Sequence, residues 1–260
     1  MREMKGRKPM QNALLVGLSR QVALARELDV VANNVANMNT TGYKADGSVF
    51  EEYLNSAARA DQTGARVSFV LDRGTWHNMR QGPVERTGNP LDVAIDGSAF
   101  LVVQTPRGER YTRNGALQIN ATGQLVTSEG DTVLGDSGPI TIQPNDHQVS
   151  ISRDGTISVR EGTSNVDSAR GKLRLVTFAN PQQLQKDGGS TFNATGGAQP
   201  QDAPNSGLIQ GVIEKSNVHG VVEMTRMIEI TRTYTQIAAM LQQQNDLNQQ
   251  AINKLADVPA

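Results

Sequence analysis

The two ends of the chain carry the same helical pattern, and this constrains the fold more than any other feature. From about residue 11 to 38, and again from about 217 to 256, apolar side chains recur at steps of three and four. Such spacing is typical of amphipathic helices that pack along a coiled-coil-like seam. The predicted stripe of the first helix is Leu14, Leu18, Ala25, Leu28, Ala32 and Val35. The predicted stripe of the second helix is Met227, Ile230, Tyr234, Ile237 and Leu241.

The middle of the chain, from about residue 67 to 213, has a different pattern. Short runs of alternating apolar residues, such as Val93 with Ile95 and Ile157 with Val159, are separated by glycine turns such as Asp154-Gly155. Strand-like runs with Asp-Gly and Asn-Gly turns at this spacing predict an all-β domain of the sandwich or barrel type.

The predicted fold class is therefore α+β, with a discontinuous coiled-coil-like domain of N- and C-terminal helices flanking a central all-β domain. We expect six segments along the chain. They are a basic N-terminal extension (1–9), a helix with its terminal motif (10–44), a connecting segment (45–87), the β domain (88–186), a loop and return segment (187–210), and the C-terminal helix (211–260).

Composition excludes several classes of protein. The 260 residues include no cysteine, so disulfides, thiolate metal sites and cysteine nucleophiles are ruled out. A balance of 25 basic and 26 acidic residues gives no sign of a nucleic-acid partner. The apolar stretches are far shorter than the ~20 residues that a membrane-spanning helix needs. The basic start of the chain is followed by too short an apolar run for a cleaved signal peptide, so we expect none.

No residue cluster points to catalysis. The three histidines, at 77, 147 and 219, lie far apart and lack partners at metal-binding spacing. Asp92 and Asp96 flank a predicted strand, and Ser98 has no base beside it in the sequence, so an acid–base pair or a nucleophile is not indicated. We assign no catalytic, metal-binding or cofactor-binding residue and expect no enzyme and no cofactor.

Three motifs follow one another along the chain: LDVVANNVANMNTTGYK at 28–44, the stretch from Gly88 to Gly135, and GVIEKSNVHGVVEMTRMIEITRTY at 211–234. Together they resemble the signatures of flagellar rod and hook proteins. On these motifs the chain is identified as a member of the flagellar basal-body rod family, and within it the chain is most like the proximal rod subunits.

This resemblance implies a structural protein of the bacterial flagellum that polymerises through its terminal helices. The implied assembly is a hollow axial shaft in the periplasm that transmits torque and passes exported subunits. The implied partners are copies of this chain, other rod proteins and the flagellar type III export apparatus, with no nucleic acid, small-molecule substrate or membrane insertion.

The same resemblance implies which residues matter. Hydrogen bonds across subunits are expected from an asparagine cluster, which consists of Asn33, Asn34 and Asn37. The motif residues carried over from the family are Thr41, Gly42, Tyr43, Lys44, Ser216, Asn217 and Val218.

Several alternatives remain open. The terminal stripes are either surfaces for neighbouring subunits or an ordinary core within one chain. If they are surfaces for neighbours, we expect the ends to be disordered in the monomer and to fold on assembly. Other identities are a distal rod or hook-type axial protein, a secreted β-rich adhesin or fibre subunit, and a hydrolase on a β scaffold.

Overall fold

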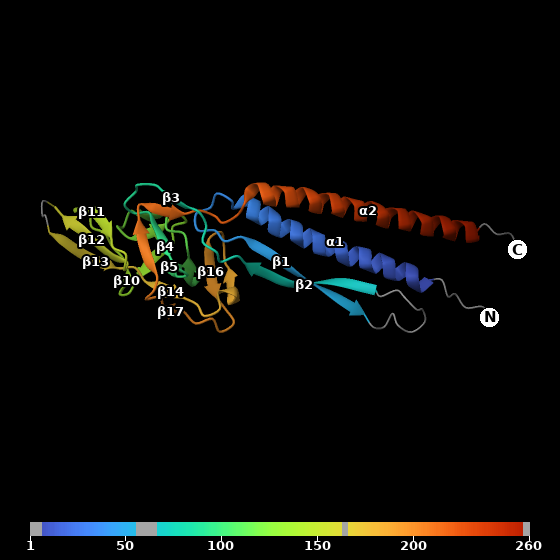
Figure 1. Ribbon diagram of the computed structural model, residues 1–260, viewed down its shortest axis with the longest axis horizontal. Coiled ribbons are helices and arrows are strands. Elements are labelled where there is room, and N and C mark those ends of the chain that lie inside the picture. Colours follow the sequence, from blue (N-terminus) through green and yellow to red (C-terminus); the bar gives the residue numbers. More distant parts are fainter. Residues whose placement is uncertain (1–6, 56–66, 163–165, 257–260) are drawn as a thin grey trace. The chain divides into compact units, whose positions relative to one another are not determined.

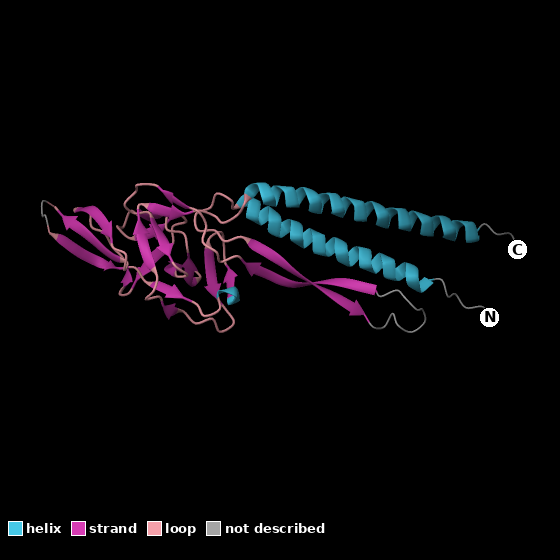
Figure 2. Cartoon of the chain, in the orientation of Figure 1, coloured by secondary structure: helices cyan, strands magenta, loops and turns pink. Residues whose placement is uncertain are grey.

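The computed structural model describes residues 7–55, 67–162 and 166–256. The chain divides into two compact units, each built from separate stretches of sequence. The helical unit comprises Met1–Val35, Asp46–Trp76 and Gly220–Ala260, and the β unit comprises Ala36–Ala45 and His77–His219. Helices, strands and loops are distinguished in Figure 2. The α+β class with terminal helices flanking a β-rich middle is confirmed.

In its described residues, the helical unit holds two long helices and one β-hairpin. Helix α1 spans Arg7–Ala36 and α2 spans Gly220–Ala256, and they lie side by side in Figure 1. Pro9 is tolerated near the start of α1 because first-turn N–H groups have no helical acceptor. The chain turns directly after α1, where the Thr40 N–H donates to the Asn37 carbonyl at 3.1 Å.

The hairpin of the helical unit was expected only in part. Strand β1 spans Asp46–Asn55 and β2 spans Val67–His77, and they pair as a two-stranded sheet. β2 begins where the predicted strand-like pattern starts, whereas β1 lies in the part of segment 45–87 that was predicted only as a connection. Charged and glycine residues interrupt the apolar alternation of β1, which hides its strand pattern.

The described residues of the β unit form short strands and a 3-10 turn, η2 (Pro181–Gln183). Its strands are β3 (Val84–Arg86), β4 (Val93–Asp96), β5 (Phe100–Thr105), β6 (Gly108–Thr112), β7 (Leu117–Ile119), β8 (Leu125–Thr127), β9 (Thr132–Gly135), β10 (Gly138–Pro139), β11 (Asp146–Ile151), β12 (Thr156–Glu161), β13 (Asp167–Lys172), β14 (Leu175–Thr177), β15 (Leu184–Lys186), β16 (Thr191–Ala194), β17 (Gln201–Asp202), β18 (Gly207–Gln210) and β19 (Val212–Glu214).

The described strands of the β unit form four sheets. The largest runs in the order β15-β16-β6-β5-β9-β8-β7, with β10 beside β9 and with β14 joining β5 to β17. A three-stranded sheet has the order β11-β12-β13, and the two remaining sheets are the pairs β18-β4 and β19-β3. All these pairings are antiparallel.

Strand β5 lies between two apolar cores. Leu101 and Val103 belong to a core made largely of aliphatic side chains from β4, β7, β8, β9 and β12. Phe100 and Val102, on the opposite face, belong to a core with Tyr111, Phe178 and Phe192. Alternate residues of a strand point to opposite faces of the sheet, so β5 must be apolar throughout its first four positions.

The segment 187–210, predicted as a loop, contributes three strands. β16, β17 and β18 lie in it, and β18 pairs with β4 over its whole length. Leu208 on β18 is buried in the aliphatic core. The abundance of glycine and proline in this stretch marks turns between short strands, and the strands are too brief to show alternation. Among the described residues, no helix is long and apolar enough to cross a bilayer.

Candidate assembly interface

The predicted apolar stripe of α2 faces α1 of the same chain. Ile230 is buried and the other members are half-buried, namely Met227, Tyr234, Ile237 and Leu241. Arg226 Nη2 donates to Glu27 Oε1 at 2.7 Å. A Cβ added to Gly17 would lie 2.7 Å from Leu241 Cδ2. The helices are therefore antiparallel, and this seam is formed within one chain.

The predicted stripe of α1 does not coincide with the buried face of that helix. Ala23, Val31 and Asn34 are buried, whereas Leu18 is 49% exposed and Ala32 is also exposed. The remaining described members of the stripe are half-buried: Ala25, Leu28 and Val35. The side chain of Leu14 lies outside the described residues. Apolar periodicity missed the buried face because that face carries a polar and a small residue.

A row of exposed apolar side chains remains on α1. Leu15, Leu18 and Val22 are 50%, 49% and 50% exposed. Their spacing of three and four places them on one face of the helix. We call these three residues the α1 outer patch.

A similar row lies on the N-terminal half of α2. Val221, Met224 and Ile228 are 81%, 45% and 69% exposed, again at steps of three and four. We call them the α2 outer patch. Further along α2, Met240 and Leu247 are 56% and 57% exposed at a spacing of seven. Rows of exposed apolar residues on a protein surface mark sites of association.

The asparagine cluster is divided among different roles. Asn34 is buried, its Nδ2 donates to the Asp46 carbonyl at 2.8 Å, and its Oδ1 accepts from the Asp46 N–H at 2.9 Å. The amide of Asn34 therefore holds the start of β1 against α1 within the chain. Asn37 Oδ1 accepts from Thr40 Oγ1 at 3.1 Å in the turn after α1, and Asn33 is exposed.

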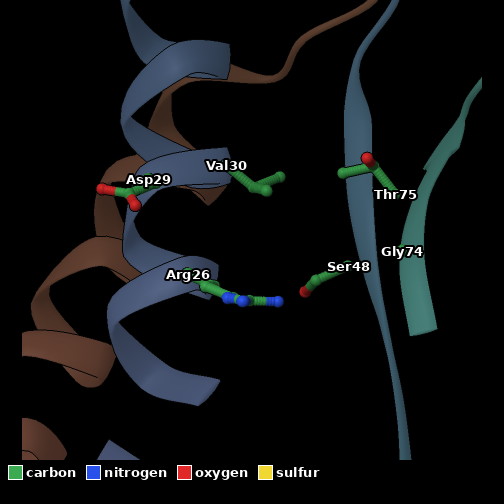
Figure 3. A pocket seen from close by; sticks show the side chains of 6 residues that line it. All are labelled: Arg26, Asp29, Val30, Ser48, Gly74 and Thr75. Carbon is green, nitrogen blue, oxygen red and sulfur yellow. The ribbon is translucent and has the colours of Figure 1, made fainter. Parts of the chain in front are cut away.

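The hairpin and α1 enclose a small open pocket of about 250 Å³. Figure 3 shows Arg26 and Val30 pointing from α1 toward Ser48 and Thr75 on the strands, with Asp29 turned away from them. Ser48 Oγ is buried without a hydrogen-bond partner. The opposite face of β1 carries Gly47, where an added Cβ would lie 2.3 Å from the Trp76 indole Nε1.

Buried charges connect the two sequence motifs inside the β unit. The side chains of Lys44 and Glu214 are fully buried, and Lys44 Nζ lies 2.5 Å from Glu214 Oε1. Lys44 Nζ also donates to the Arg80 carbonyl at 2.8 Å. Glu214 Oε1 accepts from the Gly82 N–H at 2.9 Å. Arg113, 3% exposed, donates from Nε to Glu214 Oε2 at 2.9 Å.

Arg113 also anchors the strand turn beside this group. Its Nη1 donates to the carbonyls of Gly97 and Ala99 at 2.9 Å each, and its Nη2 donates to the Ile95 carbonyl at 3.2 Å. Every guanidinium nitrogen of Arg113 therefore has a partner, which is the condition for burying this group. We call Lys44, Arg113 and Glu214 the junction triad.

The position of Lys44 alters its protonation. Burial, and after it the positive charge of Arg113, lowers the pKa of the Lys44 ammonium from the ordinary 10.5 to about 8. The carboxylate of Glu214 and its hydrogen bond act in the opposite direction. Desolvation disfavours the charged form of a lysine, and here it outweighs the ion pair.

The other motif residues surround the triad. Gly42 has φ +69°, and an added Cβ would lie 2.4 Å from the Arg113 carbonyl carbon, so only glycine fits there. Tyr43 is buried, with Lys186 Nζ 3.6 Å from its ring centre. Ser216 is buried, while Thr41, Asn217 and Val218 are half-buried. The predicted motif is thus brought together, although its members lie at the two ends of the β unit's sequence.

Sequence reasoning missed Glu214 and Arg113 as the partners of Lys44. Both lie within the quoted motifs but carry no local signal, since Lys44 and Glu214 are separated by 170 positions. A charged residue directly after two apolar ones in a short strand, as in Val212–Glu214, was the available hint.

The residues weighed for catalysis have structural partners. Asp92 Oδ1 accepts from Asn89 Nδ2 at 3.0 Å, and Asp96 pairs with Arg153 at 2.9 Å. Ser98 Oγ lies 3.5 Å from Thr177 Oγ1 at the surface. His77 Nε2 lies 3.1 Å from the Leu184 carbonyl. Within the described part of the chain, no group of acidic or histidine side chains is arranged to hold a metal ion.

Family models match three parts of the chain. The flagella basal body rod protein model matches residues 14–44, the flagellar hook protein FlgE/F/G D1 domain matches 94–159, and the flagellar basal body rod FlgEFG protein C-terminal model matches 209–254. The first ends at Lys44 and the last includes Glu214, so the buried ion pair joins the two terminal matches.

Curated relatives match nearly the whole chain. The flagellar basal-body rod protein FlgF of Caulobacter vibrioides is 40% identical over 96% of this chain and 100% of its own length. FlgF of Mesorhizobium japonicum is 35% identical over 95% and 98%, and FlgG of Bacillus subtilis is 30% identical over 94% and 99%. The chain therefore belongs to the flagellar basal-body rod protein family, most like FlgF, and is a structural subunit of the bacterial flagellum and no enzyme.

Proposed function

We propose that this chain is a proximal rod subunit that polymerises through its two terminal helices into a hollow axial shaft. The observation that carries the proposal is the pair of outer patches, which leave apolar side chains exposed on both helices after the α1–α2 seam is formed. Placement in the proximal rod rests on the resemblance to FlgF proteins.

The two outer patches suit a contact between different surfaces of neighbouring copies. They differ in sequence, one carrying Leu15, Leu18 and Val22, the other Val221, Met224 and Ile228. A contact between two unlike surfaces continues from copy to copy and builds a helical assembly when it does not close. Proposed partners are copies of this chain and other rod proteins.

The interface that we propose combines the accessible part of the predicted α1 stripe with the two outer patches. The α1 members that stay exposed or half-buried are available to neighbours: Leu18, Ala25, Leu28, Ala32 and Val35. Exposed Asn33 is proposed to contact a neighbour. Asn34 is left out, because its amide is engaged by the backbone of Asp46.

Substitutions in the outer patches test the proposal. Leu18→Glu and Ile228→Glu place a charge on each patch while leaving the α1–α2 seam intact. Ile119→Glu is the matched control, because Ile119 is 41% exposed on β7 of the β unit. We expect both helix variants to keep the circular dichroism of the parent chain but to abolish motility in cells that lack the parent.

The control should restore motility, and basal bodies isolated from those cells should contain a complete rod. Full motility with both helix variants would overturn the polymerisation proposal. The proposal would be supported if a helix variant folds in solution but is missing from isolated basal bodies, because the patches are proposed to act when the subunit is incorporated.

We also propose that the subunit passes through the flagellar type III export apparatus without a cleaved signal and joins the rod in the periplasm. Mass spectrometry of the chain from isolated basal bodies tests this, and an unprocessed N-terminus is expected. Removal of an N-terminal segment during passage would count against this route.

The glutamine- and asparagine-rich end of α2 fits a wet channel. Gln243, Gln249 and Gln250 are exposed, and polar amides offer little apolar surface to a passing chain. We propose that this face lines the shaft. Gln243→Leu with Gln250→Leu should slow the secretion of later flagellar proteins, measured by immunoblot of the medium, whereas unchanged secretion would contradict it.

A further inference from the structure

The chain passes between the two units at four places, and three of them meet at one side chain. The crossings follow Val35, Ala45, Trp76 and His219. Asn217 Oδ1 accepts from the Ala45 N–H at 2.7 Å, and Asn217 Nδ2 donates to the Asn78 carbonyl at 2.7 Å. The Asn78 N–H in turn donates to the Ala45 carbonyl at 2.8 Å. Residues from three separate crossings are thus held by a single amide.

One member of the junction triad, Glu214, lies close to Asn217 in the sequence. Glu214 is three residues before Asn217, and its own carbonyl accepts from the Gly42 N–H at 2.8 Å. Its carboxylate accepts from Lys44, Gly82 and Arg113. The return segment 214–217 therefore contacts residues 42–45, residues 78–82 and Arg113.

Apolar burial contributes little to the attachment of this segment. All three residues of β3 are exposed, and in its partner β19 only Glu214 is buried. Val84 on β3 is 47% exposed. The charged and amide groups, together with the backbone pairing of β3 and β19, must hold the segment in place.

The triad depends on the carboxylate at its centre. Without Glu214, Lys44 and Arg113 would be two buried cations with no counter-charge between them. Breaking a buried pair by removing one member is strongly destabilising, because an uncompensated charge remains in a medium of low polarity.

We propose that Glu214 and Asn217 form a latch, which is a set of hydrogen bonds and ion pairs that holds together the segments at which the chain leaves the β unit. Breaking these interactions frees residues 42–45 and 78–82 together. The latch is a conformational device separate from the polymerisation surfaces. It assigns a physical role to the paired motifs at the two ends of the chain, and it fixes where the strands that enter the helical unit leave the β unit.

Hydrogen exchange of the full-length chain, measured amide by amide, tests the latch. Glu214→Gln removes the charge with little change in shape. We expect the amides of Gly42, Ala45 and Gly82 to exchange roughly tenfold to a hundredfold faster, while the amides of β5 keep their parental protection. Asn217→Ala should release Ala45 and Asn78 in the same way.

Lys215→Ala is the matched control, because Lys215 lies between the two latch residues and forms an exposed ion pair with Glu85. This variant should leave the four reporter amides unchanged. The latch is refuted if those amides stay protected in both Glu214→Gln and Asn217→Ala, or if the Lys215→Ala control releases them equally.

Loss of protection throughout the β unit in Glu214→Gln would show that this residue supports the whole fold. Asn217→Ala, at a half-buried position, then decides between the two roles. Local release of Ala45 and Asn78 supports the latch, and parental exchange at both amides refutes it.

Discussion

The two units of the molecule differ in how completely they satisfy their own apolar surface. The β unit encloses an aliphatic and an aromatic core on the two faces of β5, and its buried charges are matched in the junction triad. The described side chains of the helical unit include only three buried apolar residues, Ala23, Val31 and Ile230. Several larger ones stay exposed on the same helices.

This difference indicates which part of the protein depends on neighbours. Hydrophobic burial is the main favourable term in folding, so a unit with a narrow seam has little margin of its own. The β unit can be stable in a single chain, whereas the helical unit gains from surfaces that another subunit supplies. The expected disorder of the ends in the monomer stays a prediction.

Hydrogen exchange in a dilute monomer should show the largest contrast. The amides of β5 are expected to exchange roughly a thousandfold more slowly than those in the second half of α2, because local opening of a narrow seam requires far less free energy than opening a core. Nuclear magnetic resonance measures both rates in one sample. Equal protection in the two regions would remove the distinction between the units.

Truncating a buried aromatic ring in the β unit, and separately an exposed side chain in the helical unit, sharpens the comparison between the two units. Phe192 is fully buried and packs edge-on against Phe100 with ring centres 5.8 Å apart. Phe192→Ala should lower the free energy of unfolding by about 3–5 kcal/mol. Leu18→Ala should change it by less than about 0.5 kcal/mol. Denaturant titrations followed by circular dichroism give both values, and a large loss in Leu18→Ala would place Leu18 in an intramolecular core.

The junction triad makes the β unit respond to alkaline pH. Lys44 has a pKa of about 8 in the folded chain and 10.5 ordinarily, so between these values the unfolded chain binds more protons. The free energy of unfolding should therefore rise with pH across this window, by on the order of 2 kcal/mol. Below pH 8 both states hold the proton and the contribution is flat.

Lys44→Met removes this titration and serves as the control for all other groups. The free energy of unfolding of the parent minus that of the variant, measured by urea titration, should be larger at pH 9.5 than at pH 7.5. A difference that is the same at both values would mean that Lys44 titrates normally.

The smallest effect is expected from the ion pair across the helical seam. Arg226 and Glu27 are 43% and 19% exposed at their side chains, so solvent and salt screen them. Arg226→Met should weaken the seam by about 0.2–1 kcal/mol, and by less in 1 M salt. Hydrogen exchange of the neighbouring α1 amides reports the change, with the exposed Arg232→Met as a matched control on the same helix.

The sequence predicted the parts of the fold that have a periodic residue pattern or a recurring turn motif. The stripe of α2 matched the face that packs on α1, and the Asp154-Gly155 turn is present, with Gly155 at φ +90°. The buried face of α1 was missed because Asn34 lies on it, serving the backbone of Asp46. Strand β1 was missed because it mixes charged and apolar residues.

The candidate sites were predictable to different degrees for a physical reason. Motif residues such as Gly42 and Lys44 could be singled out from a short stretch. Their partners could not, because Arg113 and Glu214 are brought to Lys44 by strand pairings that no local pattern encodes. The outer patches follow from knowing which face of each helix is already occupied, and only the structure gives this.

The position of β5 between the two cores affects how the β unit unfolds. One strand supplies adjacent side chains to both apolar cores, so neither core can open while the strand stays in place for the other. Heating should accordingly melt the aliphatic and the aromatic halves in a single calorimetric transition. An engineered cavity on either face would then lower the melting temperature of both.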